Sequence, residues 1–164
     1  MGVEPFLIYT LTLKDGGRIG ISRLPGRSGQ LAGDVAKIAT WNAACVVSLT
    51  QEDEMNRKGG SGLAEMLGQA RIPWQSFAIT DYGAPQKLDQ RWPALAASLH
   101  DMLDHGHGVL LHCAGGQGRS GMVAMRLMVE RGLSADEALA AIRAVRPGAV
   151  ETMQQREWGA AGRR

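Results

Sequence analysis

The spacing of apolar residues changes once within the first forty positions, and the change predicts two kinds of element. Apolar and β-branched residues alternate with polar ones over residues 6–13 and again over 18–21, a pattern typical of strands. Turn residues at 15–17 separate the two runs, so we expect a hairpin spanning about residues 6–21. From Leu31 onward apolar residues recur every three or four positions, which predicts a helix.

Short apolar runs and helical patterns alternate along the rest of the chain. Buried strands are predicted at residues 45–49, 74–79 and 109–111. Helices are predicted at about 63–70, 95–103 and 121–130, and again after Ser134, which opens a capping box with Glu137. The polar, glycine-rich stretch 51–62 is predicted to be a loop. Because strands and helices alternate, we expect an α/β fold with a central, mostly parallel sheet of about five strands flanked by helices.

Composition supports one globular domain and argues against nucleic-acid and membrane partners. The chain has 164 residues, of which 45% are hydrophobic and 21% charged. Its fourteen arginines are scattered rather than clustered, so we expect no nucleic-acid surface. No apolar run is long enough to cross a bilayer, and no basic segment precedes the apolar stretch within residues 1–13. We therefore expect a cytoplasmic protein without membrane insertion.

The two cysteines, Cys45 and Cys113, are too few for a disulfide framework. Cys45 opens one predicted strand, whereas Cys113 lies just beyond the end of another. If these strands are parallel neighbours, the two residues are about 13–16 Å apart, and a disulfide needs Cα atoms within roughly 7 Å. We therefore expect Cys45 to remain a free, buried thiol.

A glycine-rich segment, residues 112–120, follows the last predicted strand and precedes a helix. Its three glycines let the backbone curl so that successive N–H groups point inward, and the helix adds its positive N-terminal end. Arg119 can bind two oxygens of one phosphate with its planar guanidinium group. The same donors favour the thiolate form of Cys113. The segment therefore predicts a nucleophile and an anion site in the same place.

This segment resembles the signature of the cysteine-dependent protein phosphatases, in which His-Cys is followed by five residues and then Arg-Ser or Arg-Thr. The chain is most similar to the compact dual-specificity type, and within it to the kinase-associated phosphatase group. Residues 79–85 are similar to that group's general-acid loop, and residues 141–155 to its C-terminal segment. The resemblance covers about residues 40–158, while the first 30 residues match loosely.

The resemblance implies a role for each residue of the loop. Cys113 would attack phosphorus and form a phosphocysteine. His112 would orient the loop and support the thiolate. Ser120 would donate a hydrogen bond to the sulfur, although it is also a plausible N-cap for the next helix. The phosphate would be bound by Ala114, Gly115, Gly116, Gln117, Gly118 and Arg119.

Proton transfer and water activation need groups from outside the loop. Asp81, in the segment that resembles the general-acid loop, would protonate the leaving oxygen, with Asp89 as the rival. Gln155 would position the water of the second step, and its neighbour Gln154 is the alternative. The acidic residues 52–54 are expected in a solvated loop, although Glu54 matches an acidic position in the related group that could hold Arg119.

Together these features predict a single phosphatase domain over residues 1–164, with a catalytic core at about 30–158. It would hydrolyse phosphate monoesters through a phosphocysteine, as a dual-specificity or tyrosine protein phosphatase, with no cofactor and no metal. Alternatives are a phosphatase of a small phosphorylated molecule, such as an inositol phosphate or a phosphoinositide, and a silent phospho-binding module. Inorganic phosphate or sulfate is expected to bind the 113–119 loop.

Overall fold

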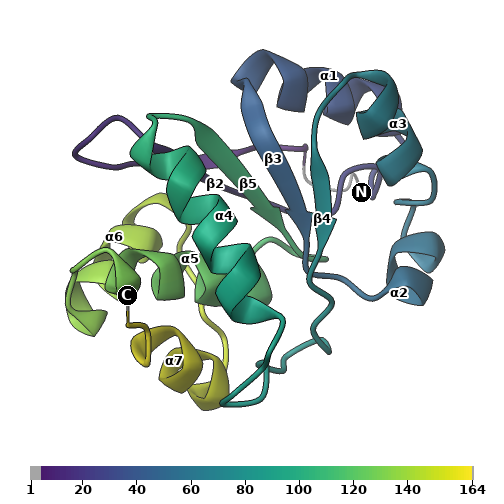
Figure 1. Cartoon of the computed structure of the whole chain (residues 1–164). Coiled ribbons are helices and arrows are strands. Elements are labelled where there is room, and N and C mark those ends of the chain that lie inside the picture. Colours follow the sequence, from purple (N-terminus) through teal and green to yellow (C-terminus); the bar gives the residue numbers. More distant parts are fainter. Residues whose placement is uncertain (1–4, 164) are drawn as a thin grey trace.

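A computed structural model describes residues 5–163 of the chain and shows one five-stranded sheet with helices on both faces (Figure 1). The strand order is β1-β2-β5-β3-β4, in which only the β1–β2 pair is antiparallel. The strands are β1 (Tyr9–Thr12), β2 (Arg18–Ser22), β3 (Ala43–Ser48), β4 (Trp74–Ser76) and β5 (Gly108–His112). The predicted α/β fold with a mostly parallel sheet is confirmed.

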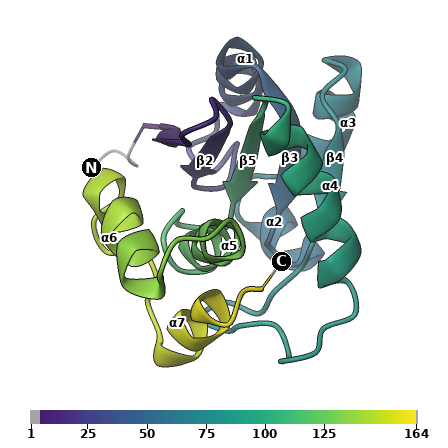
Figure 2. The ribbon, with the colours of Figure 1, turned by 60° about the vertical axis from the view of Figure 1, so that its left-hand side comes forward.

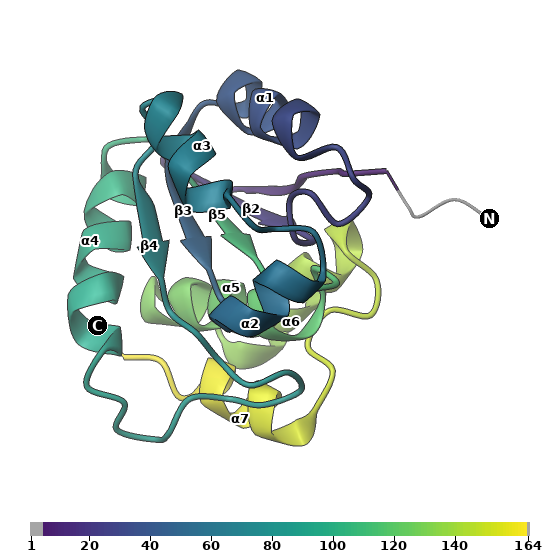
Figure 3. The same ribbon diagram turned by 90° about the vertical axis from the view of Figure 1, so that its right-hand side faces the viewer.

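The helices form two layers because the buried strands are apolar on both faces. They are α1 (Leu31–Trp41), α2 (Glu52–Arg57), α3 (Leu63–Gln69), α4 (Trp92–Asp104), α5 (Gly118–Glu130), α6 (Ala135–Val145) and α7 (Met153–Ala160). The first three contribute to one apolar cluster and the last four to the other. Figure 2 shows α5 end-on beside the sheet, with α6 and α7 farther from the sheet than α5. Figure 3 shows α1 and α3 together on the other face of the sheet.

Two predicted strands are shorter than expected. The hairpin pairs Tyr9 with Ile21 and Thr12 with Arg18, so β1 begins three residues later than the alternation suggested. The strand predicted at 74–79 ends at Ser76. The amide of Phe77 still donates to the carbonyl of Ser48, the last residue of β3, and the amide of Ile79 to the carbonyl of Leu49, so this segment continues along the end of the sheet.

The prediction of a loop over residues 51–62 is wrong, because α2 occupies Glu52–Arg57. The Gln51 and Glu54 side chains form a capping box at its start, and Met55 packs into a core cluster. A helix of six residues with a single buried apolar side chain has too little periodicity to be seen in the sequence. Figure 3 shows α2 at the end of the sheet toward which the strand arrows point.

The helix predicted from residue 121 begins three residues earlier, at Gly118. Gln117 is its N-cap, so Ser120 lies inside the first turn and the prediction of Ser120 as an N-cap is wrong. The capping box of Ser134 and Glu137 is confirmed at the start of α6. Among residues 5–163, every helix is too short or too polar to cross a membrane.

Candidate active site

The loop from Cys113 to Gln117 connects β5 to α5, and its residues are mostly buried, although Gly115 is exposed. Cys113 is 2% exposed, and its Sγ lies 3.3 Å from the hydroxyl oxygen of Ser120. Gly116 has a φ of 70°, and a Cβ at this position would lie 2.6 Å from the backbone nitrogen of Arg23. Only glycine therefore allows the loop to curl this closely against the end of β2.

Two arginines hold the loop from its outer side by its carbonyl oxygens. Arg27 Nη1 donates to the carbonyl of Ala114 at 2.8 Å. Arg146 donates from Nη2 to Gly115 and from Nε to Gly116, each at 3.0 Å. In a trans peptide the next N–H points opposite to the carbonyl, so the amides that follow these carbonyls face the inside of the loop. This is the arrangement of an anion-binding nest.

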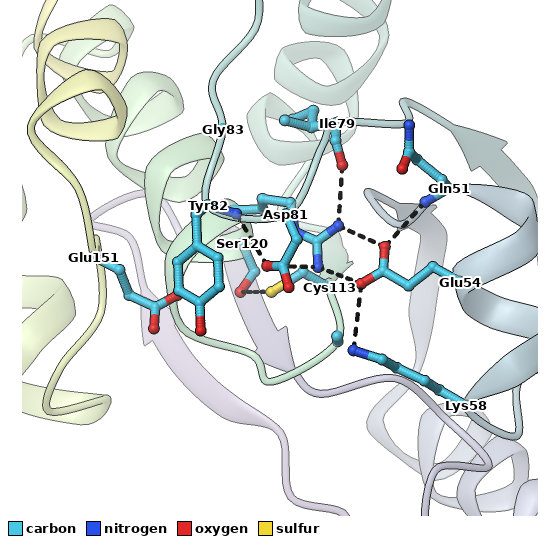
Figure 4. A network of polar contacts seen from close by, with 12 residues as sticks. Gln51, Glu54, Lys58, Ile79, Asp81, Tyr82, Gly83, Cys113, Ser120 and Glu151 are labelled. Carbon is cyan, nitrogen blue, oxygen red and sulfur yellow. Dashed lines mark hydrogen bonds and ion pairs between the residues drawn. The ribbon is translucent and has the colours of Figure 1, made fainter.

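Arg119 is 1% exposed and is held by Glu54, which is 4% exposed. Its Nη1 and Nη2 donate to the two carboxylate oxygens of Glu54 at 2.8 and 2.7 Å, and Nη1 also donates to the Ile79 carbonyl at 3.0 Å (Figure 4). These hydrogen bonds hold the pKa of Glu54 below its usual value. The prediction that Glu54 is solvated is wrong, and the alternative, that it holds Arg119, is what the structure shows.

The loop between β4 and α4 brings Asp81 to the same arginine. Asp81 Oδ1 lies 3.2 Å from Arg119 Nη2, and the Asp81 side chain is 46% exposed. The rival Asp89 lies elsewhere: both of its carboxylate oxygens bind Arg91, which holds the Asp89 pKa below its usual value. Asp89 also precedes α4 instead of lying in its first turn. Of the two candidates, only Asp81 therefore reaches the loop.

His112 lies at the end of β5 and links the edge of the sheet to Cys113. Its Nδ1 lies 3.2 Å from the Cys113 carbonyl, which can only accept, so Nδ1 carries the hydrogen. Its Nε2 therefore accepts from the Ser48 hydroxyl, which in turn accepts from the Trp74 indole N–H at 2.8 Å. Burial, assisted by the charge of Arg119, lowers the His112 pKa to about 4, so the ring is neutral.

The start of α7 holds the loop that carries Asp81. Gln155 is fully buried, and its Nε2 donates to the Gly83 carbonyl at 3.1 Å, while its Oε1 accepts from the backbone of Glu151 and Thr152. The Thr152 hydroxyl donates to the carbonyl of Tyr82 at 3.3 Å. Gln154 is exposed, so Gln155 is the glutamine that faces the site.

Gln155 and Glu151 also lie against Gly118, where the loop that begins at Cys113 enters α5. A Cβ at Gly118 would lie 3.0 Å from either polar atom of the Gln155 amide and 2.3 Å from Glu151 Oε1. Figure 4 shows the Glu151 side chain on the opposite side of Cys113 from Glu54. Glu151 is therefore a third carboxylate near the loop, beside Asp81 and Glu54.

Sequence reasoning missed the groups that support the loop from outside. Arg27 carries no pattern that distinguishes it from the other scattered arginines. Two of these residues could have been found from the sequence. Arg146 lies in the segment that resembles the family's C-terminal segment, and Ser48 is a lone hydroxyl inside an apolar strand. Both cysteines are free and buried, as expected for Cys45, and burial raises the Cys45 pKa to about 11.

Fold and site define a class of protein: an α/β domain in which a buried cysteine lies at the base of a loop that has the arrangement of an anion-binding nest and ends at an arginine. Residues 44–158 match the family model for the dual specificity phosphatase catalytic domain. The chain therefore belongs to this family.

Individual relatives agree with this assignment. The chain is 33% identical over 131 residues to the putative tyrosine phosphatase 067L of Invertebrate iridescent virus 3, which covers 76% of this chain and 51% of the viral protein. The chain thus spans about half the length of this curated relative. It is 30% identical to Tk-PTP in its active form, over 85% of this chain and 87% of that one, with a TM-score of 0.70.

A kinase associated phosphatase whose catalytic-site cysteine is replaced by serine has the same fold. The TM-score is 0.83 at 22% identity, covering 95% of this chain and 93% of that chain. Because the sequence identity is low, this similarity shows a shared fold and nothing further.

Proposed function

We propose that the protein is a cysteine-dependent phosphatase that hydrolyses phosphate monoesters of proteins through a phosphocysteine intermediate. The observation that carries this proposal is the convergence of three groups: the Cys113 thiol beside Ser120, the inward amides of the loop, and Arg119 fixed between Glu54 and Asp81. Residues 1–164 would act as one catalytic domain. We place the reaction in the cytoplasm, where thiols remain reduced.

In the first step the Cys113 thiolate attacks phosphorus and the bond from phosphorus to the ester oxygen breaks. Asp81, in its protonated form, gives its proton to the leaving oxygen. The loop amides and Arg119 bind the three remaining oxygens, whose charge they stabilise in the transition state. Nε of Arg119 donates to no described residue, so it is available to the phosphoryl group together with the Nη2 that meets Asp81.

In the second step water attacks the phosphocysteine and the bond from sulfur to phosphorus breaks. Asp81, now a carboxylate, accepts the proton of the water, because the acid of one step is the base of the reverse step. Ser120 donates to the departing sulfur. Gln155 remains our candidate for orienting the water, since its amide lies against Gly118 and also holds the Asp81 loop at Gly83.

Phosphorylated proteins are the substrates we propose, because the loop between Cys113 and Arg119 carries no lysine to bind additional phosphates. The site is also open at Tyr82, whose side chain is 61% exposed beside Asp81. The alternative is a small phosphorylated molecule; a neighbour of the same fold, PTPMT1, was solved with PI(5)P at 16% identity. A panel of phosphopeptides and inositol phosphates would separate the two substrate classes.

The direct test compares p-nitrophenyl phosphate hydrolysis by the wild type, Cys113→Ser and Cys45→Ala. We expect turnover in the wild type and in Cys45→Ala, and none in Cys113→Ser. Calorimetric titration with inorganic phosphate should show binding to Cys113→Ser, because the loop amides and Arg119 remain. A Cys113→Ser variant that hydrolyses the substrate at near the wild-type rate would overturn the mechanism.

A further inference from the structure

Tyr82 follows the proposed acid Asp81 and has a φ of 60°, a backbone conformation that aromatic residues rarely adopt. It is the third residue of the turn at 80–83, which is closed by the Gly83 amide donating to the Thr80 carbonyl at 2.8 Å. A positive φ at the third position of such a turn favours glycine or asparagine. Gly83 is not among the residues with a positive φ, so the strained position is occupied by a tyrosine although a glycine lies next to it.

The backbone of Tyr82 and Gly83 is held at all four of its polar groups. The Tyr82 N–H donates to Asp81 Oδ1 at 3.0 Å, and the Gly83 N–H closes the turn. The Thr152 hydroxyl donates to the Tyr82 carbonyl at 3.3 Å, and Gln155 Nε2 donates to the Gly83 carbonyl at 3.1 Å. A strained conformation persists only where its surroundings determine it, and such conformations cluster at active sites.

The tyrosine ring takes little part in holding this conformation. Tyr82 is 61% exposed, and its hydroxyl forms no hydrogen bond with any residue of the described range 5–163. The conformation is therefore set by hydrogen bonds of the backbone and not by packing of the ring. What position 82 contributes to the site is its amide.

This amide makes the two oxygens of the Asp81 carboxyl different. Oδ1 accepts from the Tyr82 N–H and also lies 3.2 Å from Arg119 Nη2, whereas no residue in the described part of the chain donates to Oδ2 (Figure 4). A protonated carboxyl has one oxygen that carries the hydrogen and one that can only accept. Because Oδ1 is turned toward two donors, the hydrogen is carried by Oδ2.

The sign of φ at Tyr82 decides where its N–H points. A four-residue turn with the same closing hydrogen bond can have a positive or a negative φ at its third residue. The two forms differ by a rotation of about 180° of the peptide between the second and third residues. With a negative φ at Tyr82, its N–H would therefore point away from the side on which Asp81 Oδ1 now lies.

We propose that Tyr82 is a positioning residue for proton transfer and that it acts through its backbone amide. Its positive φ aims the N–H at Asp81 Oδ1, so that Oδ2 is the oxygen that gives its hydrogen to the leaving oxygen. Thr152 and Gln155, from the start of α7, hold the carbonyls at the exit of the turn. This inference rests on the proposed role of Asp81 as the general acid.

The test compares phenyl phosphate, whose leaving oxygen needs a proton, with dinitrophenyl phosphate, whose leaving group is already acidic. Tyr82→Pro removes the N–H and fixes φ at about −65°. We expect its kcat/KM to fall about tenfold more with phenyl phosphate than with dinitrophenyl phosphate. Tyr82→Asn and Tyr82→Gly keep the N–H and tolerate a positive φ, so they should keep the wild-type ratio between the two substrates. Leu88→Pro, in the same loop at an amide that bonds no described residue, controls for the effect of a proline.

Thermal unfolding establishes that each variant is folded; if Tyr82→Pro is not, Tyr82→Val, which keeps the N–H but disfavours a positive φ, should show a loss in the same sense. Equal losses on the two substrates, or a Tyr82→Gly variant as selectively impaired as Tyr82→Pro, would overturn the proposal. Asp81→Asn, measured on the same substrates, tests the acid role separately. If Asp81→Asn shows the selective loss and Tyr82→Pro does not, this inference fails alone. If Asp81→Asn shows equal losses, Asp81 transfers no proton and both fail.

Discussion

Arg119 meets four protein oxygens before any substrate arrives: two from Glu54, one from the Ile79 carbonyl and one from Asp81. A guanidinium group fixed in this way needs no reorganisation when charge develops on the phosphoryl oxygens. Its planar geometry matters as much as its charge, because a lysine ammonium cannot reproduce the planar fork that binds both Glu54 oxygens and still presents N–H groups to a phosphate.

We therefore expect Arg119→Lys to lower kcat/KM for p-nitrophenyl phosphate by about 10²–10³-fold, although the charge is kept. Arg57→Lys, at an exposed position on α2, is the matched control and should leave kcat/KM unchanged. Steady-state kinetics of both variants check this. A near-normal kcat/KM for Arg119→Lys would remove this residue from its proposed role as the phosphate clamp.

Asp81 is half-exposed beside Arg119, and the proposed mechanism gives it the proton of the leaving oxygen. For Asp81→Asn we expect kcat to fall about 10²–10⁴-fold with alkyl or phenyl phosphates, whose leaving groups need a proton. The loss should be smaller with an aryl phosphate whose leaving group is already acidic. Equal losses for both substrate types would mean that Asp81 supports the loop and transfers no proton; Asp89→Asn serves as the control.

His112 makes stability depend on pH because its pKa is about 4 in the folded protein and about 6.5 when the chain is unfolded. Between these values the unfolded chain binds the extra proton, so the free energy of unfolding falls as pH drops from about 6.5 to 4, by about 3 kcal/mol in total. Urea midpoints measured across this range should show a shallower slope for His112→Gln. Parallel curves for the two proteins would contradict a buried, neutral His112.

At the scale of elements, α2 is the helix on which the arginine depends. In Glu54→Gln the buried guanidinium of Arg119 keeps one neutral acceptor in place of two carboxylate oxygens. We therefore expect the free energy of unfolding to fall by about 3 kcal/mol, and kcat/KM to fall as well. Asp53→Asn, which removes an exposed ion pair from the same helix, should change little. Urea unfolding of both variants tests this, and equal midpoints would contradict the structural role of Glu54.

The elements also show where sequence patterns stop being informative. The apolar runs and the Ser134 capping box located most strands and helices, because their periodicity reflects burial directly. Helix α2 was not predicted because it buries only two residues, Glu54 and Met55, and one of these is charged. The burial of Glu54 depends on Arg119, 65 residues away in sequence, and no local pattern encodes a partner at that distance.

At the scale of the whole molecule, parallel pairing brings the carboxyl ends of β3, β4 and β5 to one edge, and their loops deliver Glu54, Asp81 and Cys113 to it. The motif around Cys113 and the position of Asp81 could be predicted, since each lies in a short recognisable segment. Arg27, which holds the loop by the Ala114 carbonyl, could not, because its function depends on how distant segments pack against the loop.

The central claim is that phosphate passes through a covalent bond to Cys113. The most direct measurement is mass spectrometry of enzyme quenched in acid during turnover of p-nitrophenyl phosphate, followed by digestion. We predict that the peptide containing Cys113 gains the mass of one phosphoryl group, and that this species is absent from Cys113→Ser. A phosphoryl group found on another residue, or hydrolysis by Cys113→Ser at the wild-type rate, would contradict the account.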